Sequence, residues 1–461
     1  MRLNRLIPLI MFLFGYNVVN AQIDSVCIDI ASKSIEWLNT DNVESLCLKY
    51  DKAVAARLSV STTSSIWNQI ESQFGEFVKV DTLVTNTIND NFIVEQVLEF
   101  EKSYLKYRLS FNAENQIAGI FFIPYRTAAA ATESTKVFEE TKCSFVNDDI
   151  EFPAILCTPK KQKSKAVVIL IHGSGPSDMD ETIGPNKIFK QIANKLAKYG
   201  IASLRYDKRS YLAQQGKLEG RLQTDIDHIV VSDAIAAAKF MHSVDSLENL
   251  PRIIMGHSLG AHMAPKIALE SSNVDAIVML AANARPLEDL VMEQYKYLMA
   301  PDGYTKEEKK ELKTLKKKVK NVKKLKKYIA KGKVVELPLS NDTAFWLSLN
   351  DYKPLQTVNN LQMPILIIQG GRDYQVRKED FEIWHSNSLQ SINKDQTFIL
   401  YSGLNHLFIY GNKASYPEEY NKKGEVSENM IHDVSDWIKS IWDSNYSEPK
   451  LKRGITHYRK G

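Results

Sequence analysis

The hydrophobic positions follow a helical spacing at the start of the chain and then change to alternation. Between Ile23 and Tyr50, apolar residues recur at helical intervals. From Glu76, apolar and polar residues alternate in four runs separated by polar breaks, which is typical of strands. The runs are EFVKVDTLVT, NFIVEQVLEFE, YLKYRLSFN and QIAGIFFIP. We therefore predict a small α+β domain over residues 22–132, with helices first and an antiparallel meander after them.

A second pattern begins after Thr127–Thr135, a small, polar stretch that we interpret as a linker. Two strand-like runs flank Asn147-Asp148-Asp149, which is a hairpin signal. Continuous apolar runs such as KAVVILIH follow, and they are typical of strands buried on both faces. Helical stretches separate them at about Lys187–Lys198, Asp225–Met241 and Val426–Trp442. The alternation predicts an α/β fold over residues 133–445, with a mostly parallel sheet and helices on both faces.

Two segments interrupt or extend this pattern. An insertion at about 287–362 contains a lysine-rich stretch in which Leu312, Leu315, Val319, Val322, Leu325 and Ile329 recur three or four positions apart. This spacing predicts a basic amphipathic helix, and we interpret the insertion as a lid because it leaves the sheet at the edge where such folds bind ligands. The helix has either a solvated basic face or a surface for anionic partners. The tail, residues 446–461, is polar and basic, and we expect disorder there.

The N-terminus carries a targeting pattern. Arg2 and Arg5 precede a short apolar core, Leu6–Phe14, and Val19-Asn20-Ala21 ends in a small residue. Residues 1–21 therefore fit a secretory signal peptide cleaved after Ala21, which predicts a secreted or periplasmic protein. An uncleaved anchor is the alternative, but the apolar run is short for a span, and no later stretch is apolar enough to cross a bilayer.

Composition and cysteine content narrow the function classes. The net charge of +4 on 461 residues is small, which argues against a nucleic-acid binder. Export would permit a disulfide between Cys27 and Cys47, whereas Cys27, Cys47, Cys143 and Cys157 could equally be small buried residues. Cysteine and histidine spacings indicate no metal site, so we predict no metal.

The segment PRIIMGHSLGAHMA carries the first candidate for chemistry. Ser258 lies between Gly256 and Gly260, after a buried strand-like run and before a helical one, which fits the G-x-S-x-G nucleophile turn. The turn is so tight that a side chain at either glycine would clash, and its strain would hold the serine hydroxyl above the sheet edge. A strand–helix turn with an inert serine is the alternative.

A serine hydroxyl needs a base, and two later loops offer one. Asp373 follows the run ILIIQGG, and His406 follows FILYSG, so the order serine, acid, histidine agrees with this fold class. We expect His406 to accept the serine proton and Asp373 to orient the imidazole. Three residues in this order, each after its own strand, argue against three unrelated surface side chains.

An oxyanion requires inward-pointing N–H groups. The glycine-rich loop HGSGPSDMDETIGPNKIF follows the first long buried run, and we predict an oxyanion hole from the N–H groups of Leu259 and Ser174, with Gly175 as the alternate. His172 is expected to brace this loop, while His257 and His262 are expected to be bystanders. Lys208 and Arg209 either line the sheet edge or form structural ion pairs.

The motifs HGSGPSDMDETIGPNKIF, LRYDKRS, GHSLGAH, GGRDYQV and LNHLF resemble the α/β-hydrolase superfamily. More narrowly, they resemble bacterial secreted carboxylesterases in which a small N-terminal domain precedes the hydrolase domain. The resemblance spans about Lys136 to Ser444, implies hydrolysis of short acyl esters without a cofactor, and carries over Ser258, Asp373 and His406 as the triad. The lysine-rich insertion departs from the pattern.

Together these features predict a serine esterase for short- to medium-chain acyl esters, with a small-molecule partner and no nucleic acid. One rival is a prolyl-oligopeptidase-like peptidase, which would need an anchor for a substrate amine or carboxylate. The other is a binding protein on an inert hydrolase fold. The N-terminal unit could be a binding module, a dimer contact or a wall of the pocket, and the natural ester and the oligomeric state stay open.

Overall fold

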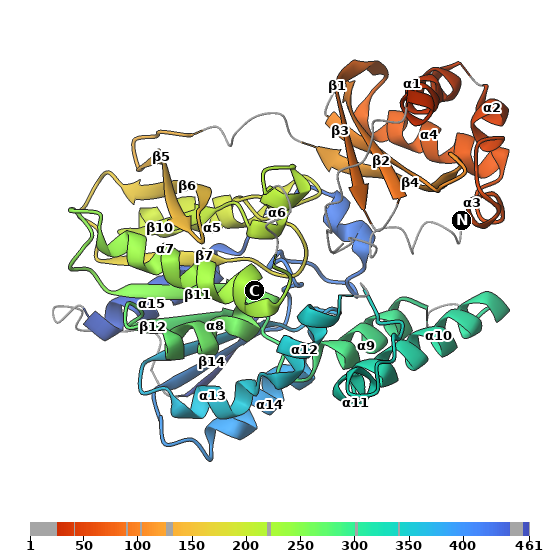
Figure 1. Cartoon of the computed structure of the whole chain (residues 1–461). Helices are drawn as coiled ribbons and strands as arrows, with labels where there is room; N and C mark the ends of the chain where they lie inside the picture. Colours follow the sequence, from red (N-terminus) through yellow and green to blue (C-terminus); the bar gives the residue numbers. More distant parts are fainter. Residues whose placement is uncertain are drawn as a thin grey trace. The chain divides into compact units, whose positions relative to one another are not determined.

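The computed structural model describes residues 25–40, 42–88, 91–101, 104–125, 132–218, 223–299, 303–339, 342–442 and 455–460. The predicted signal peptide lies outside these residues. The described residues form two compact units, one ending at Tyr125 and one beginning at Thr132 (Figure 1). Among them, no helix is long and apolar enough to cross a membrane.

The N-terminal unit pairs a helical layer with a four-stranded antiparallel sheet of order β1-β2-β3-β4, as the change of periodicity predicts. Its helices are α1 (Ser25–Asn39), α2 (Val43–Cys47), α3 (Lys52–Ala55) and α4 (Val60–Phe74). Its strands are β1 (Phe77–Ile88), β2 (Asn91–Phe100), β3 (Tyr104–Phe111) and β4 (Ile117–Tyr125). Helix α4 was not among the predicted elements; its Trp67 packs against Phe77, Phe100 and Phe122 of the sheet.

The C-terminal unit is built on a nine-stranded sheet of order β15-β14-β13-β12-β11-β7-β10-β6-β5. Strands β5 (Phe138–Asn147) and β6 (Ile150–Pro159) form an antiparallel hairpin, and β10 (Ile201–Tyr206) runs antiparallel to β6. The other pairings are parallel, as predicted. These remaining strands are β7 (Ala166–Ile171), β11 (Arg252–His257), β12 (Ala276–Leu280), β13 (Ile365–Gly370), β14 (Gln396–Tyr401) and β15 (Thr456–Arg459). A separate two-residue pair, β8 (Thr182–Ile183) and β9 (Asn186–Lys187), lies in the loop after β7.

The hairpin signal around Asn147 has a local explanation. Asp148 and Asp149 both have positive φ, 50° and 59°. Two successive left-handed residues form the type I′ turn, whose twist matches that of the strands it joins.

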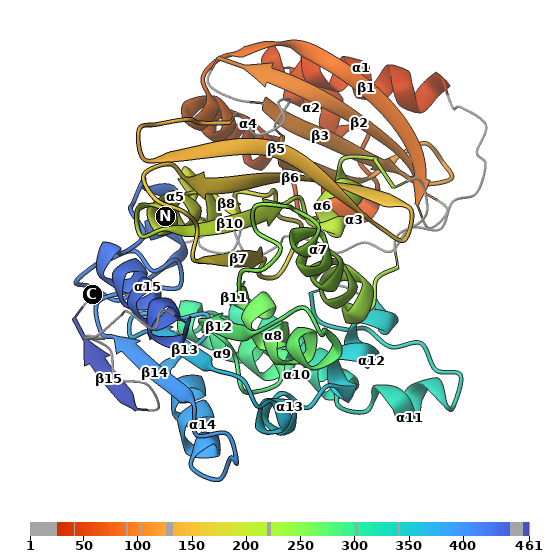
Figure 2. The same ribbon diagram turned by 90° about the vertical axis from the view of Figure 1, so that its left-hand side faces the viewer.

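Helices cover both faces of the sheet, as the strand–helix alternation predicts (Figure 2). One face packs against α5 (Ile188–Lys198) and α15 (Glu428–Trp442). The other packs against α7 (Asp233–His242), α8 (Leu259–Glu270) and α14 (Lys378–Ser388). The stretch predicted as one helix from Asp225 begins as a π-helix, Asp227–Ser232, before α7. Short helices at Arg209–Gln214 (α6) and Pro417–Asn421 (3-10) complete the unit.

The insertion between β12 and β13 is helical, as predicted. It comprises α9 (Leu287–Met299), α10 (Lys306–Val322), α11 (Leu325–Ile329), α12 (Thr343–Asp351) and α13 (Pro354–Asn360). The single basic helix of the prediction is thus two, broken after Val322. The last two helices belong to the core, because Trp346 and Val358 are fully buried in the cluster that includes α8. A lid that moves as one body over residues 287–362 would have to uncover these side chains.

The structure differs from one sequence expectation and decides one alternative that the sequence left open. The expected disorder of the tail is wrong for Thr456–Arg459, which form the edge strand β15 parallel to β14. A strand at the sheet edge buries few side chains, so its sequence lacks the hydrophobic alternation that marks the others. The Cys27–Cys47 disulfide is not formed: the Cys27 thiol donates to Asn115 and the Cys47 thiol to Thr63.

Candidate active site

Ser258 occupies the junction between buried strand β11 and helix α8. Its backbone has φ 53° and ψ −116°, a left-handed φ that is strained for a residue with a side chain. A Cβ on Gly256 would lie 2.3 Å from the Gly260 backbone, and one on Gly260 would lie 2.2 Å from the Ile171 carbonyl oxygen. Both positions therefore require glycine, for the steric reason that the sequence suggests.

Ser258 lies at the carboxyl end of the central parallel strands. Its N–H donates to the Leu280 carbonyl at the end of β12, over 2.9 Å. A Cβ on Gly173, in the loop after β7, would lie 3.2 Å from the Ser258 Cβ, so the glycine-rich loop passes directly beside the serine. The Ser258 side chain remains half-buried while its neighbours in β11 are fully enclosed.

Asp373 and His406 come together at the same edge of the sheet. Asp373 follows β13 and His406 follows β14, and the His406 Nδ1 donates to the Asp373 Oδ2 over 2.7 Å. The other oxygen, Oδ1, accepts from the backbone N–H groups of Gln375 and Val376, at 2.8 and 3.0 Å. The Gln369 amide donates to Oδ2 at 3.1 Å. This set of donors fixes the direction of the buried carboxylate.

Behind His406 lies a buried ion pair. His257 Nε2 donates to the His406 carbonyl over 2.9 Å, and His257 Nδ1 faces the Glu181 Oε2 at 3.0 Å. The other Glu181 oxygen accepts the Gly173 N–H at 2.8 Å. Burial lowers the pKa of His257, but Glu181 outweighs it and the net shift is upward; burial raises the pKa of Glu181, but His257 makes the net shift downward. These contacts tie the glycine-rich loop to the backbone of His406.

Lys208 controls the orientation of that loop. Its ammonium is buried and donates to the carbonyls of Gly173 and Gly175, at 2.6 and 3.1 Å. In a planar trans peptide the C=O of one residue and the N–H of the next point in opposite directions. Because the Gly173 carbonyl points at Lys208, the N–H of Ser174 points away from it. Burial lowers the pKa of Lys208 to about 8, although Glu181 and Asp233 oppose the shift.

Of the three backbone candidates for the oxyanion hole, Leu259 follows Ser258 directly, and Ser174 and Gly175 follow Gly173, which lies beside Ser258. Leu259 is the first residue of α8, and the first N–H groups of a helix have no acceptor within it. Ser174 is exposed, and Gly175 has φ +86°, a conformation that favours glycine. The Gly173 N–H is not available, because Glu181 accepts it.

Known proteins resemble this chain over most of its length. The family model described as serine aminopeptidase, S33, matches residues 162–412, more than half of the chain. Esterase EstD from Thermotoga maritima is 33% identical over 88% of this chain and 93% of its own length. The chain belongs to this family of α/β-hydrolases. It is an esterase-type serine hydrolase, which confirms the resemblance and the class of enzyme predicted from the motifs.

The other comparisons concern the N-terminal unit and the fold. A family described only as a protein of unknown function (DUF3887) matches residues 31–120. Among solved structures, a Pyrococcus furiosus esterase has a TM-score of 0.41 at 15% identity, covering 66% of this chain and 91% of that one. A puromycin-hydrolyzing peptidase of Mycobacterium tuberculosis has a TM-score of 0.42 at 12% identity, covering 79% and 48%.

Three further histidines of the hydrolase, His172, His257 and His262, have backbone or carboxylate partners. His172 Nε2 donates to the Asp178 carbonyl at 3.1 Å, so it braces the loop as expected. Burial lowers its pKa to about 4, and burial lowers that of His262, which contacts the Asn283 carbonyl, to about 4. His257 is packed, and its ring joins Glu181 to the His406 carbonyl.

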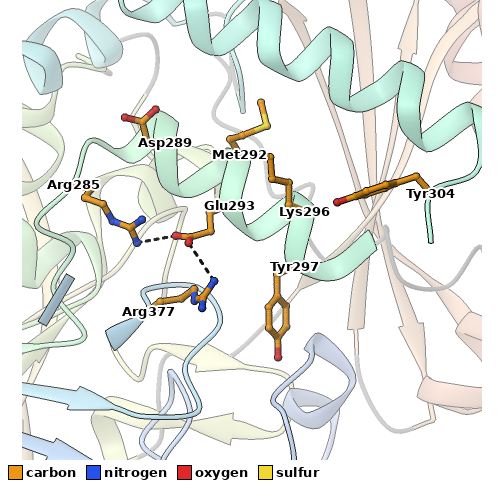
Figure 3. A pocket seen from close by; sticks show the side chains of 8 residues that line it. All are labelled: Arg285, Asp289, Met292, Glu293, Lys296, Tyr297, Tyr304 and Arg377. Carbon is orange, nitrogen blue, oxygen red and sulfur yellow. Dashed lines mark hydrogen bonds and ion pairs between the residues drawn. The ribbon is translucent and has the colours of Figure 1, made fainter. Parts of the chain in front are cut away.

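The hydrolase has a charged pocket of about 550 Å³ between α9 and the loop that carries Asp373. Figure 3 shows Arg285 and Arg377 both directed at Glu293, at 2.7 and 3.3 Å. Asp289, in the same pocket, pairs with Lys323 at 2.6 Å. The carboxylates of this pocket are thus already neutralised, and its lining is mostly charged or polar.

Sequence reasoning missed the role of Glu181 and left that of Lys208 undecided. The one available signal was that Lys208 and Arg209 directly follow buried strand β10 and so lie at the carboxyl edge of the sheet. Arg209 forms the structural ion pair, with Asp233 at 2.6 Å, whereas Lys208 donates hydrogen bonds to the carbonyls of the glycine-rich loop. Among the described residues, no group of three or more His, Cys, Asp or Glu side chains is placed to hold a metal ion.

Proposed function

We propose that the protein hydrolyses short- to medium-chain acyl esters through an acyl-enzyme on Ser258, with His406 as base and Asp373 as its partner. The observation that carries the proposal is the 2.7 Å contact between Asp373 and His406 at the sheet edge where the strained Ser258 turn also lies.

The protonation states follow from the contacts. An ionised carboxylate can only accept a hydrogen bond, so the His406 Nδ1 carries the proton and Nε2 keeps its lone pair. Nε2 takes the proton from the Ser258 hydroxyl as its oxygen attacks the ester carbonyl, and the imidazolium is stabilised by Asp373. The imidazolium then protonates the departing alcohol. Water attacks the acyl-enzyme, gives a proton to His406, and releases the acid and free Ser258.

The oxyanion of each tetrahedral intermediate needs two fixed donors. We assign the N–H groups of Leu259 and Ser174, with Gly175 as the alternate. Two observations support this assignment. Leu259 is the first residue of α8, and the Gly173 carbonyl accepts from the Lys208 ammonium, so the Ser174 N–H of the same peptide points away from Lys208. Donors that are already oriented cost no reorganisation as the charge develops, and each contributes on the order of a hundredfold or more to kcat.

The rival peptidase activity would need an anchor for a substrate amine or carboxylate, and an amine would need a free carboxylate of the protein. In the pocket beside the Asp373 loop, Glu293 and Asp289 are already bound to basic side chains, which disfavours this role. An inert binding protein would have no need for the Asp373 contacts or for the strained Ser258.

The proposal also includes export directed by residues 1–21 and domains at residues 22–132 and 133–445. Mass spectrometry of the mature protein should find Gln22 as its first residue.

The nucleophile is tested with Ser258→Ala. We expect a folded protein whose kcat falls on the order of a millionfold, because a triad without its nucleophile retains only residual catalysis. Ser271→Ala, at the other end of α8, is the matched control and should keep normal activity. A fluorophosphonate should label the unmodified protein on Ser258 alone, as read by peptide mass spectrometry. Retention of a tenth of the activity by Ser258→Ala would remove this serine from the mechanism.

The substrate class is tested with a series of straight-chain acyl esters. An apolar acyl site gains about 0.8 kcal/mol, or roughly fourfold in kcat/KM, for each methylene it buries, until its depth is exhausted. We expect kcat/KM to rise and then fall, with the optimum at short to medium length. Alanyl and prolyl peptide amides, measured on the same preparation, should be poor substrates. Cleavage of any amide faster than the best ester would favour the peptidase.

A further inference from the structure

Positive charge is concentrated in one segment of the chain. Residues 303–339, here called the lysine segment, contain 14 lysines and four glutamates but no aspartate or arginine, which gives a net charge of +10. The whole chain has a net charge of +4, so the remainder has −6. The net charge of the segment is therefore opposite in sign to that of the rest of the chain.

The apolar face of this segment is already occupied. In α10, Leu315 and Val319 pack against Val291 of α9. Val322 at the end of α10 and Leu325 at the start of α11 join the main core. Figure 1 shows α10 lying beside α9. The lysines consequently point outward. The exposed ones are Lys306, Lys309, Lys310, Lys313, Lys316, Lys317, Lys320, Lys323, Lys324, Lys326, Lys327, Lys331 and Lys333.

Few of these charges are neutralised within the molecule. Among the described residues, Lys323 pairs with Asp289 and Lys326 with Asp351, and the other exposed lysines of the segment have no carboxylate partner. Ordinary solvated lysine faces are interspersed with acidic residues, which limits their attraction for anions. Here the stretch from Leu312 to Val335 contains eleven lysines and no acidic residue.

Apolar side chains are exposed beside these lysines. Val334 is completely exposed and Ile329 is 44% exposed, and Lys331 and Lys333 lie between them in the turn after α11. An apolar side chain flanked by lysines suits a boundary between polar headgroups and acyl chains, because the lysine stems reach the phosphates while the apolar group enters the boundary.

We propose that the lysine segment docks onto the surface of an anionic phospholipid bilayer, with the lysines facing lipid phosphates and Val334 and Ile329 at the headgroup boundary. Base-specific recognition of nucleic acid is less favoured, because its commonest contacts come from arginine forks, and the segment has no arginine. A protein partner that binds amphipathic helices is disfavoured because the apolar face of α10 packs against α9. Flexible lysine ammonium groups suit a fluid array of phosphates, and the attraction weakens as salt screens it.

The test uses the full chain and vesicles of phosphatidylcholine, with or without 30 mol% phosphatidylglycerol as an experimental choice, in a flotation assay at low and high salt. The test variant replaces Lys313, Lys316, Lys317 and Lys320 by glutamine. The control variant replaces Lys161, Lys163, Lys239 and Lys423, also exposed, by glutamine and changes the net charge equally. A further variant is Val334→Ser. Circular dichroism confirms that each variant is folded.

We expect binding to the phosphatidylglycerol vesicles only, lost at high salt. The test variant should bind at least about tenfold more weakly, the control should bind within about twofold of the unmodified chain, and Val334→Ser should bind more weakly without loss of the salt dependence. Equal binding to both kinds of vesicle, an equal loss in the control variant, or binding to an oligonucleotide without binding to vesicles would overturn the proposal. It does not depend on the esterase assignment.

Discussion

At the scale of single residues, Lys208 offers a sharp test of the oxyanion hole. It touches no expected substrate atom and acts by holding the Gly173 and Gly175 carbonyls. Lys208→Met should release the Ser174 N–H from its fixed direction and lower kcat by about a hundredfold, with KM little changed. Lys187→Met, which removes a half-exposed lysine bound to Asp180 near the same loop, is the matched control and should leave kcat near normal. A loss confined to KM would contradict the role of Lys208 in positioning the loop.

The pKa of Lys208, lowered to about 8 by burial, predicts a pH signature. Above about pH 8 the ammonium loses its proton and its hydrogen bonds to the Gly173 and Gly175 carbonyls weaken. The value of kcat should therefore decline there in the unmodified enzyme and not in Lys208→Met.

The stability of the folded protein should increase over the same pH range. Between about pH 8 and 10.5 the unfolded chain keeps this proton and the folded chain loses it. The free energy of unfolding therefore increases as pH rises, which means that the folded state becomes more stable. Kinetics and urea unfolding across this range separate the two effects; a parallel loss of stability would point to unfolding instead.

At the scale of elements, strand β15 joins the C-terminal end of the chain to the strand that precedes His406. Ser402 and Gly403 donate to the carbonyls of Arg459 and Lys460, at 2.9 and 2.8 Å. Arg459 also contacts Asp433 of α15 at 3.2 Å, which accepts the Tyr401 hydroxyl at 2.6 Å. Helix and sheet edge are thus linked through this strand.

Truncation after Trp442 should therefore destabilise the hydrolase unit. Each lost backbone bond contributes on the order of 1 kcal/mol, so we expect a total of roughly 2–5 kcal/mol, read as a lower urea midpoint. Tyr458→Ser, which changes an exposed side chain and keeps the backbone, should unfold at the normal midpoint. An unchanged midpoint in the truncated chain would mean that β15 adds nothing to stability.

At the scale of the whole molecule, all the candidate catalytic residues lie in the unit that begins at Thr132. Deletion of residues 22–131 should leave this unit folded, with measurable ester hydrolysis and a changed substrate preference or solubility. The unit has its own core on both faces of its sheet, which is the physical reason to expect independent folding. Circular dichroism and ester turnover on the truncated chain provide the measurement. A folded but fully inactive product would show that the N-terminal unit completes the site.

The sequence by itself determined the features that depend on local spacing. Apolar residues recur every second position in strands and every three or four positions in helices, because each element must place one face against a core. This spacing marked most of the strands and helices. The glycines around Ser258 and the positions of Asp373 and His406 after their strands were readable for the same reason: parallel strands end at one edge, and a tight turn excludes side chains.

Only the tertiary structure decided what depends on side chains from separate loops. Glu181 and His257, and likewise Lys208 and the Gly173 carbonyl, meet across long stretches of sequence, and no periodicity records such a polar contact. Strand β15 was not predicted, because an edge strand is held mainly by backbone hydrogen bonds and its sequence does not need the alternation of buried apolar side chains. The apolar stripe of the lysine segment was visible in the sequence, but only the tertiary structure showed that this stripe packs on α9 and leaves the lysines exposed.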